Sequence, residues 1–280
     1  MTLPLMLLGR VLLSVAASTL QKHLTRRDVG SAALWRATYL WMALPACLIV
    51  ALGLRRGLSV DFWFNALAAG TLDALGNLAM VAALRRTDLS VFGPLNGFRP
   101  VLALVFGWVF LHETPTALGA VGVGVTVIGT AMLLRDDKPE KTNGTAWQMF
   151  GLRVAGLALS TFASVFLKRA TLFGGPELTL GIWILCGLPV FWLWSSRKIE
   201  TPTDQRHLLT LHAAAFLVMQ WLTLHVFAPT LLAYSFAFFQ LAMVLQVAVG
   251  RWMFNEPHFR KRLACCAVIC AGAALITFAS

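Results

Sequence analysis

The sequence predicts an all-α polytopic membrane protein whose ten transmembrane helices form two inverted five-helix repeats. Three observations predict this fold: an apolar composition, ten apolar runs of roughly spanning length, and matching residues about 143 positions apart. Of the 280 residues, 58% are hydrophobic and 12% are charged, whereas about a quarter of a soluble domain is charged. The composition therefore excludes a soluble domain.

The apolar runs define the expected spans, because a helix needs about 20 apolar residues to cross a bilayer. Many of the ten Trp residues lie near the ends of these runs, as in an interfacial belt. A polar linker at residues 136–146 separates a first repeat, residues 1–135, from a second, residues 147–280. The predicted spans are residues 3–22, 32–54, 61–84, 89–111, 116–134, 147–167, 177–196, 207–227, 230–250 and 261–279.

Corresponding residues in the two halves predict a duplicated unit. A repeat with an odd number of spans must enter the membrane in the opposite orientation the second time, and such inverted repeats are a common plan of transporters. The pairs, 143 or 144 positions apart, are Arg10 with Arg153, Pro45 with Pro189, Asn77 with Gln220, and Glu113 with Glu256.

Residues 93–134 predict two apolar helices joined by a tight acidic turn. We expect Thr114 to be the N-cap and Pro115 the first residue of the second helix. That helix is rich in glycine, which lets helix backbones approach closely in lipid. Arg99 and Pro100 lie inside the first helix, where a charge and a helix-breaker are costly and indicate function.

Pro100, the run Phe110–Glu113 and the glycine-spaced segment Gly119–Gly129 together resemble the EamA-like modules of the drug/metabolite transporter superfamily. The resemblance implies a membrane transporter that works by alternating access. One five-helix unit would rock against the other around a central site near the midplane. The sequence departs from a symmetric pattern at Met243, which occupies the position 143 residues after Pro100.

The net charge of +11 is assigned to the membrane and not to nucleic acid. Loop Lys and Arg residues set topology and meet anionic lipids. Their distribution predicts that both termini lie outside, whereas the resemblance implies termini in the cytoplasm, so the orientation stays open. We expect a multi-pass protein of the cytoplasmic (inner) membrane, of undetermined oligomeric state.

Polar residues well inside the spans are the candidates for a substrate site. Asp73 and Asn77 are four residues apart and share one helix face. Asp73 either binds a cation or proton or pairs with Arg36 or Arg99. Arg36 either extends to the headgroups or binds an anionic group. The candidate substrate-binding residues are Arg36, Tyr39, Asp73, Asn77, Asn96, Arg99, Gln220, Tyr234 and Gln240.

Two residues could carry a coupling proton, and two others are expected to cap helices. Asp73 and His225 are the proton candidates of a proton-coupled exporter, with an uncoupled facilitator and a structural His225 as the alternatives. Glu113 and Glu256 each precede a helix that begins near a proline, where a carboxylate meets the positive end of the helix dipole. We therefore expect both to be caps.

Enzyme chemistry, metals and cofactors are not expected. The five cysteines lie in apolar segments without metal-site spacing, and no catalytic motif is present. The substrate is expected to be a small metabolite or an amphipathic compound. The alternative is a flippase for an anionic lipid or lipid-linked sugar, with Arg36, Arg99 and Arg153 guiding the headgroup; an integral-membrane lipid-modifying enzyme is the less favoured interpretation.

Overall fold

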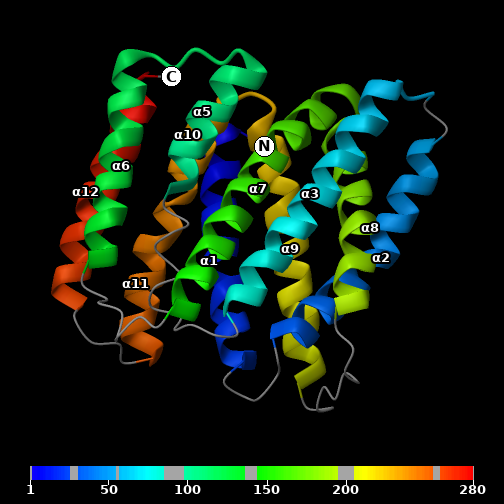
Figure 1. Ribbon diagram of the computed structural model, residues 1–280, viewed down its shortest axis with the longest axis horizontal. Coiled ribbons are helices and arrows are strands. Elements are labelled where there is room, and N and C mark those ends of the chain that lie inside the picture. The colour runs from blue at the N-terminus through cyan, green and yellow to red at the C-terminus, as the bar shows by residue number, and fades with distance from the viewer. Residues whose placement is uncertain are drawn as a thin grey trace. The chain divides into compact units, whose positions relative to one another are not determined.

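The computed structural model describes residues 2–25, 31–54, 57–84, 98–135, 144–194, 205–254 and 259–279. Within these ranges the chain is almost entirely helical and contains no strand, which confirms the predicted all-α class (Figure 1). The helices are α1 (Leu3–Thr25), α2 (Ser31–Gly53), α3 (Val60–Leu84), α5 (Arg99–Leu111), α6 (Ala117–Arg135), α7 (Gly144–Gly174), α8 (Pro176–Trp194), α9 (Arg206–Phe227), α10 (Leu232–Phe239), α11 (Leu241–Phe254) and α12 (Phe259–Ala279).

The chain divides into two compact units that cut across the two halves of the sequence. The first unit comprises residues 1–78 and 166–229, and the second comprises residues 79–165 and 230–280. Each half of the sequence thus supplies its earlier helices to the first unit and its later helices to the second. Helix α7 is shared, because its last turns belong to the first unit and the rest to the second.

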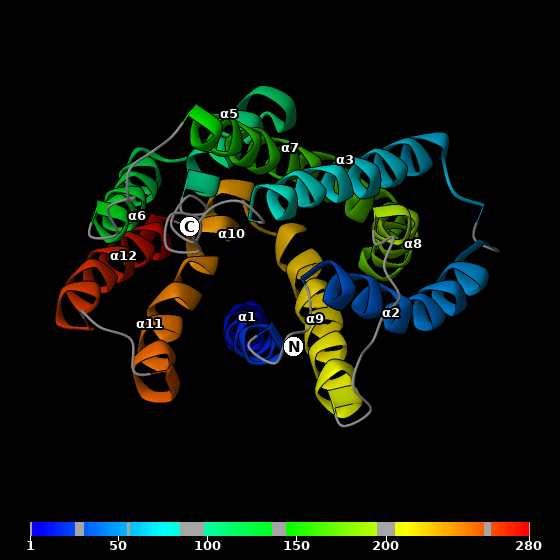
Figure 2. The ribbon, with the colours of Figure 1, turned by 60° about the horizontal axis from the view of Figure 1, so that its bottom comes forward.

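In the first unit, α1 packs on α9, and α2 packs on both α8 and α9 (Figures 1 and 2). Helix α2 shows how the apolar sequence is divided between core and surroundings. Met42 and Ala46 are buried, whereas Leu44 is 80% and Leu48 is 62% exposed. Residues at helical spacing therefore form one buried stripe and one exposed apolar stripe, as expected of a helix that faces lipid on one side.

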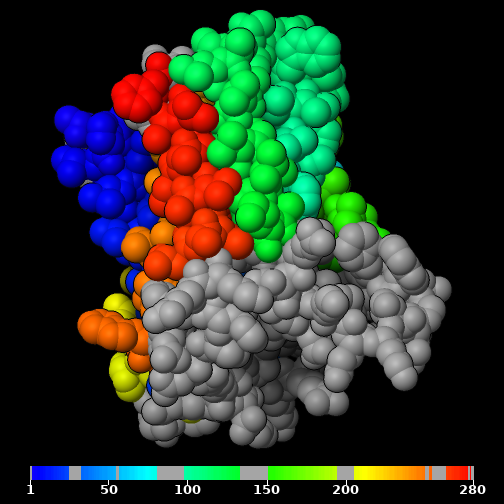
Figure 3. Space-filling model, turned by 90° about the vertical axis from the view of Figure 1, so that its left-hand side faces the viewer, coloured from blue at the N-terminus to red at the C-terminus, as the bar shows by residue number. Residues whose placement is uncertain are grey.

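In the second unit, α6 packs along α12, and α5 packs on α10 (Figure 2). The glycines of α6 allow a close approach, because a Cβ on Gly129 would lie 2.9 Å from the backbone nitrogen of Ile269. A Cβ on Gly122 would likewise lie 2.8 Å from the backbone oxygen of Gly272. Figure 3 shows α6 and α12 lying side by side along one face.

Six helices within the described ranges are long and apolar enough to cross a membrane. They lie in α1, α2, α7, α8, α9 and the combined run of α10 and α11. Parts of α5, α6 and α12 form shorter apolar helices. Helix α3 has 25 residues and carries Asp61, Asn65, Asp73 and Asn77.

The predicted span 230–250 corresponds to one apolar run, Leu232–Val249, which a tight turn at Gln240 divides into two helices. The Gln240 N–H bonds the carbonyls of Phe236 and Ala237 at this turn. Two local expectations were wrong. The N-cap of α6 is Thr116, whose hydroxyl accepts the Gly119 N–H at 3.1 Å, and not Thr114. The predicted span 147–167 ends too early, because α7 continues to Gly174.

Candidate functional site

A polar cluster around the Asp73 carboxylate joins α3 to α8 in the first unit. The Oδ2 atom of Asp73 accepts a hydrogen bond from Asn77 Nδ2 at 2.9 Å and another from the indole nitrogen of Trp183 at 3.0 Å. Asp73 and Asn77 thus share a helix face, as their spacing predicts. Trp183 was not a sequence candidate, because nothing in the local pattern indicates which indole reaches a carboxylate 110 residues away.

Tyr39 lies among aromatic rings beside this cluster. Its side chain is only 2% exposed, and its ring centroid lies 4.8 Å from that of Phe191 and 5.6 Å from that of Trp183. One residue earlier, Thr38 forms a buried hydrogen bond of 3.1 Å with Nδ1 of His212. The threonine hydroxyl is also 2.9 Å from the carbonyl oxygen of Leu34, so one polar contact in an apolar core ties α9 to α2.

Arg36 lies over an aromatic ring of the same unit. Its guanidinium carbon lies 4.0 Å from the ring centroid of Trp192 on α8, a distance at which a cation is attracted to the ring face. The structure therefore gives Arg36 a position within the first unit near the start of α2. Gln220 lies half-buried on α9 of the same unit.

Two arginines come together in the second unit. Arg99 begins α5, with Pro100 in the first turn, where proline costs no internal hydrogen bond. An Nη atom of Arg99 donates to the Ser160 hydroxyl at 3.1 Å, and its guanidinium carbon lies 5.9 Å from the Phe236 ring centroid. Arg153, about two turns before Ser160 on α7, is 5% exposed and close enough to Arg99 for electrostatic repulsion.

Glu113 contacts the start of helix α10. Helix α5 ends at His112, whose φ of 54° turns the chain, and the Glu113 side chain lies over Gly107. The carboxylate accepts the Leu232 N–H at 2.8 Å, at the start of α10. Glu113 was expected to be a helix cap, but its place in the sequence does not indicate a contact with a helix 119 residues further along the chain.

Tyr234 on α10 in turn contacts the start of α6. Its hydroxyl accepts the Thr116 N–H at 3.2 Å at the start of α6, and its ring occupies the space that a side chain at Gly119 would need. Gln240 is 6% exposed at the turn between α10 and α11. The candidates Asn96 and Glu256 lie outside the described residues.

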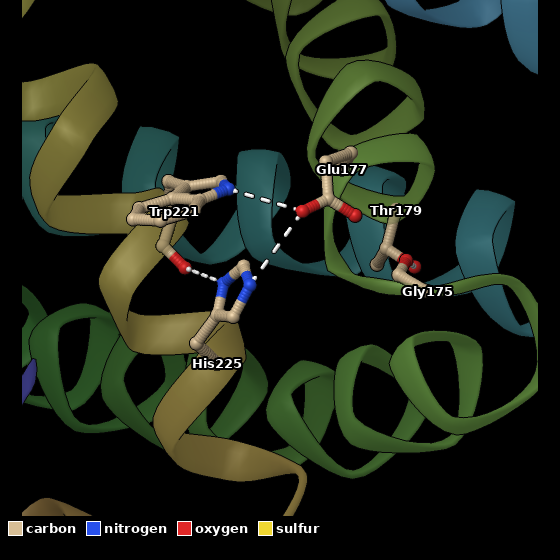
Figure 4. Close-up of polar contacts among 5 residues, drawn as sticks. All are labelled: Gly175, Glu177, Thr179, Trp221 and His225. Carbon is tan, nitrogen blue, oxygen red and sulfur yellow. Dashed lines mark hydrogen bonds and ion pairs between the residues drawn. The ribbon is translucent and has the colours of Figure 1, made fainter. Parts of the chain in front are cut away.

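His225 lies near the end of α9 and contacts a carboxylate that was not a sequence candidate. Its Nε2 is 3.5 Å from Glu177 Oε1, and its Nδ1 is 3.0 Å from the Trp221 carbonyl oxygen (Figure 4). Gly175, with a φ of +83°, follows the end of α7, and Pro176 then begins α8, so Glu177 lies in the first turn. In the sequence, this Gly-Pro-Glu run indicates that Glu177 lies at the start of a helix, but it does not indicate that His225 is the residue in contact with Glu177.

Among the described residues, no three His, Cys, Asp or Glu side chains are grouped so that they could hold a metal ion. All five cysteines are free thiols.

Comparison with known proteins finds a family model that matches the first part of the chain. Residues 2–135 match the model of the EamA-like transporter family. No curated protein matches the chain. One solved structure, described only as a crystal structure of a protein, has 18% sequence identity and a TM-score of 0.74 over 98% of this chain and 96% of the other. At this identity the likeness shows a shared fold over almost the entire chain.

The family match and the apolar helices both indicate a membrane protein. The EamA-like transporter family belongs to the drug/metabolite transporter superfamily, and it is not an enzyme family. Residues 2–135, just under half of the chain, are thus similar to the EamA-like transporter family, and the apolar helices are those of a multi-pass membrane protein.

Proposed function

We propose that the protein moves a small substrate with an anionic group across the cytoplasmic (inner) membrane by alternating access. The observation that carries this proposal is the hydrogen bond from Arg99 to the Ser160 hydroxyl, with the buried Arg153 about two turns before Ser160 on the same helix. Arg99 comes from the first sequence repeat, and Arg153 and Ser160 come from the second. This contact between residues of the two repeats supports the proposal, because transporters of this plan bind their substrates where the repeats meet.

The chemistry of the two guanidinium groups favours an anion. Charges in apolar spans are costly and mark substrate pathways. Guanidinium groups offer planar pairs of N–H donors that match carboxylate and phosphate oxygens. Two of them close together concentrate positive charge, which a bound anion would offset. The Ser160 hydroxyl adds a polar group beside them, and the Phe236 ring adds an apolar wall.

The packing of equivalent helices supports the inverted repeat that the mechanism requires. Helices α2 and α8 contain Pro45 and Pro189, which are matched residues of the two halves, and these helices pack on each other. Helix α5 packs on α10, and α6 packs on α12, and each pair again joins corresponding spans of the two repeats. Contacts between equivalent helices are expected if the repeats are related by a pseudo-two-fold axis.

The proposal is tested by thermal stabilisation of the detergent-purified protein. The panel contains inorganic phosphate, sugar phosphates, dicarboxylates, amino acids and amines, and separately phosphatidylglycerol and a polyprenyl phosphate. A water-soluble anion should stabilise the wild type by about 2.7 kcal/mol at 100 times its dissociation constant. The effect should be lost in Arg99→Gln and Arg153→Gln.

A matched control is Arg10→Gln, which removes another arginine from a span. Arg10 lies in the first unit, where its Nε donates to Thr223 Oγ1 at 3.3 Å, and we expect this variant to retain the response. Counterflow of the stabilising anion in proteoliposomes then distinguishes transport from binding. Stabilisation by the lipids alone would favour the flippase alternative, and stabilisation by amines alone would overturn the anion-binding proposal.

A further inference from the structure

We propose that His225 and Glu177 form a reversible proton-binding site, in which a bound proton joins the end of α9 to the start of α8. Use of this site for coupling rests on the proposed transport function, whereas the binding of the proton does not. Figure 4 shows the two side chains converging from these helices, with Trp221 above His225 and beside Glu177. How His225 and Glu177 hold a proton depends on which of their nitrogen and oxygen atoms carry a hydrogen.

The Trp221 carbonyl determines which nitrogen of His225 carries a hydrogen. A carbonyl oxygen can only accept, so the 3.0 Å contact with Nδ1 requires an N–H at that nitrogen. Neutral imidazole has one N–H. In the neutral ring, Nε2 would therefore direct a lone pair towards Glu177 Oε1, 3.5 Å away, and a lone pair facing a carboxylate oxygen is repulsive.

One added proton makes the same contact attractive. When a proton from water binds Nε2, the ring becomes an imidazolium with two N–H groups, and the contact becomes an ion pair. No other bond breaks, and the proton returns to water when it dissociates. The observed arrangement therefore accommodates one more proton than a neutral histidine and an ionised glutamate hold.

Three further contacts surround the pair. The Trp221 indole nitrogen lies 3.3 Å from the same Oε1 and donates to it. Glu177 is in the first turn of α8, near the positive end of the helix dipole. The Trp221 ring lies 4.2 Å from the imidazole, centroid to centroid, where an aromatic ring attracts a cation. His225 is 21% exposed and Glu177 is 54% exposed, so the pair is not enclosed by the protein core.

The helices that pack around α8 and α9 carry other titratable groups. On α1, Arg10 bonds Thr223, which points to the opposite side of α9 from His225. Lys22 and His23 precede Leu24, which packs near Leu209, about 24 Å along α9 from His225. The remaining such groups on these helices are Asp61 and Asp73 on α3, Arg36, Tyr39 and Cys47 on α2, Cys186 on α8, Arg206, His207 and His212 on α9, and Lys168 and Arg169 before the α7–α8 turn.

The test is a double-mutant cycle on the full-length purified protein, with Glu177→Gln, His225→Gln and the double variant. At pH 5.5 the two changes should couple by about 2 °C in Tm, as expected for a partly exposed ion pair. At about pH 8.5 the coupling should vanish, because the proton that makes the contact attractive has left. The matched controls are His207→Gln, an exposed histidine on α9, and Asp61→Asn, an acidic residue in the first turn of α3.

Nitrogen-15 NMR of histidine-labelled protein gives a second measurement that does not depend on stability. The His225 signals are those missing from His225→Gln. They should show both ring nitrogens protonated at about pH 5.5 and only Nδ1 protonated at about pH 8.5, the opposite of the tautomer that free histidine prefers. A coupling equal at both pH values, or an Nε2–H tautomer at the higher pH, would overturn the proposal. Neither measurement uses the substrate, so its result is independent of the Arg99 experiments.

Discussion

The Glu113 carboxylate accepts a hydrogen bond from the backbone N–H of Leu232, 119 residues further along the chain, at 2.8 Å. The contact is reciprocated, because the Tyr234 hydroxyl of α10 accepts the Thr116 N–H at the start of α6. Each element therefore caps the other. In an apolar environment, an N–H at a helix start needs such a partner because water is not available to replace it.

Replacement of Glu113 by alanine should destabilise the second unit. The change removes the acceptor of the Leu232 N–H, and loss of a helix cap typically costs about 1 kcal/mol. Glu113→Gln keeps a side-chain oxygen at the same distance along the chain and should cost less. Thermal unfolding of both variants checks this order. Equal stability of Glu113→Ala and the wild type would show that the contact contributes nothing.

Gly119→Ala should be clearly destabilising, whereas Gly124→Ala on the same helix should not. A Cβ at Gly119 would collide with the hydroxyl and ring of Tyr234, so the ring must move and lose its bond to Thr116. A Cβ at Gly124 meets nothing within 4 Å. The expected cost at Gly119 is about 1–3 kcal/mol, typical of overpacking. Thermal unfolding under identical conditions compares the two, and similar values would contradict the packing described.

Gly129→Ala should separate α6 from α12. The added Cβ would meet the Ile269 nitrogen at 2.9 Å and the Cys265 oxygen at 3.1 Å, and backbone atoms cannot move aside as a side chain can. We expect faster modification of the buried Cys265 and Cys266 by a membrane-permeant maleimide, together with a lower Tm. Gly151→Ala, where no atom lies within 4 Å, is the control. Unchanged thiol reactivity in Gly129→Ala would argue against the close approach.

Thr38→Val should destabilise the first unit, and Thr38→Ser should largely preserve it. Valine has a similar shape but removes the hydroxyl that bonds His212 Nδ1 at 3.1 Å. A buried polar group without its partner costs about 1–3 kcal/mol, whereas serine retains the oxygen. Thr210→Val, which removes an exposed hydroxyl from α9, serves as the comparison. The hydrogen bond would be unimportant if Thr38→Val and Thr210→Val had the same effect on thermal unfolding.

Much of the local structure could be predicted, because it depends on residues close together in the chain. Asp73 and Asn77 are on one face because four residues make about one helical turn. The glycines of residues 119–129 indicated close helix packing, and α6 does pack tightly along α12. Errors arose at helix ends, as at Thr116, because a cap depends on the backbone turn before the helix. Gln240 interrupts a run that is apolar on both sides, so composition does not reveal the turn there.

The sequence by itself determined the class of the protein. Composition and the apolar runs indicated a multi-pass membrane protein, because burial in lipid requires apolar helices wherever they pack. The EamA-like residues indicated the transporter family whose model residues 2–135 match. Only the tertiary structure decided the partners: Glu113 with Leu232, Arg99 with Ser160, and His225 with Glu177. In spans that are apolar on every side, periodicity does not show which face meets which helix. Long-range polar contacts therefore follow from the packing and not from any local pattern.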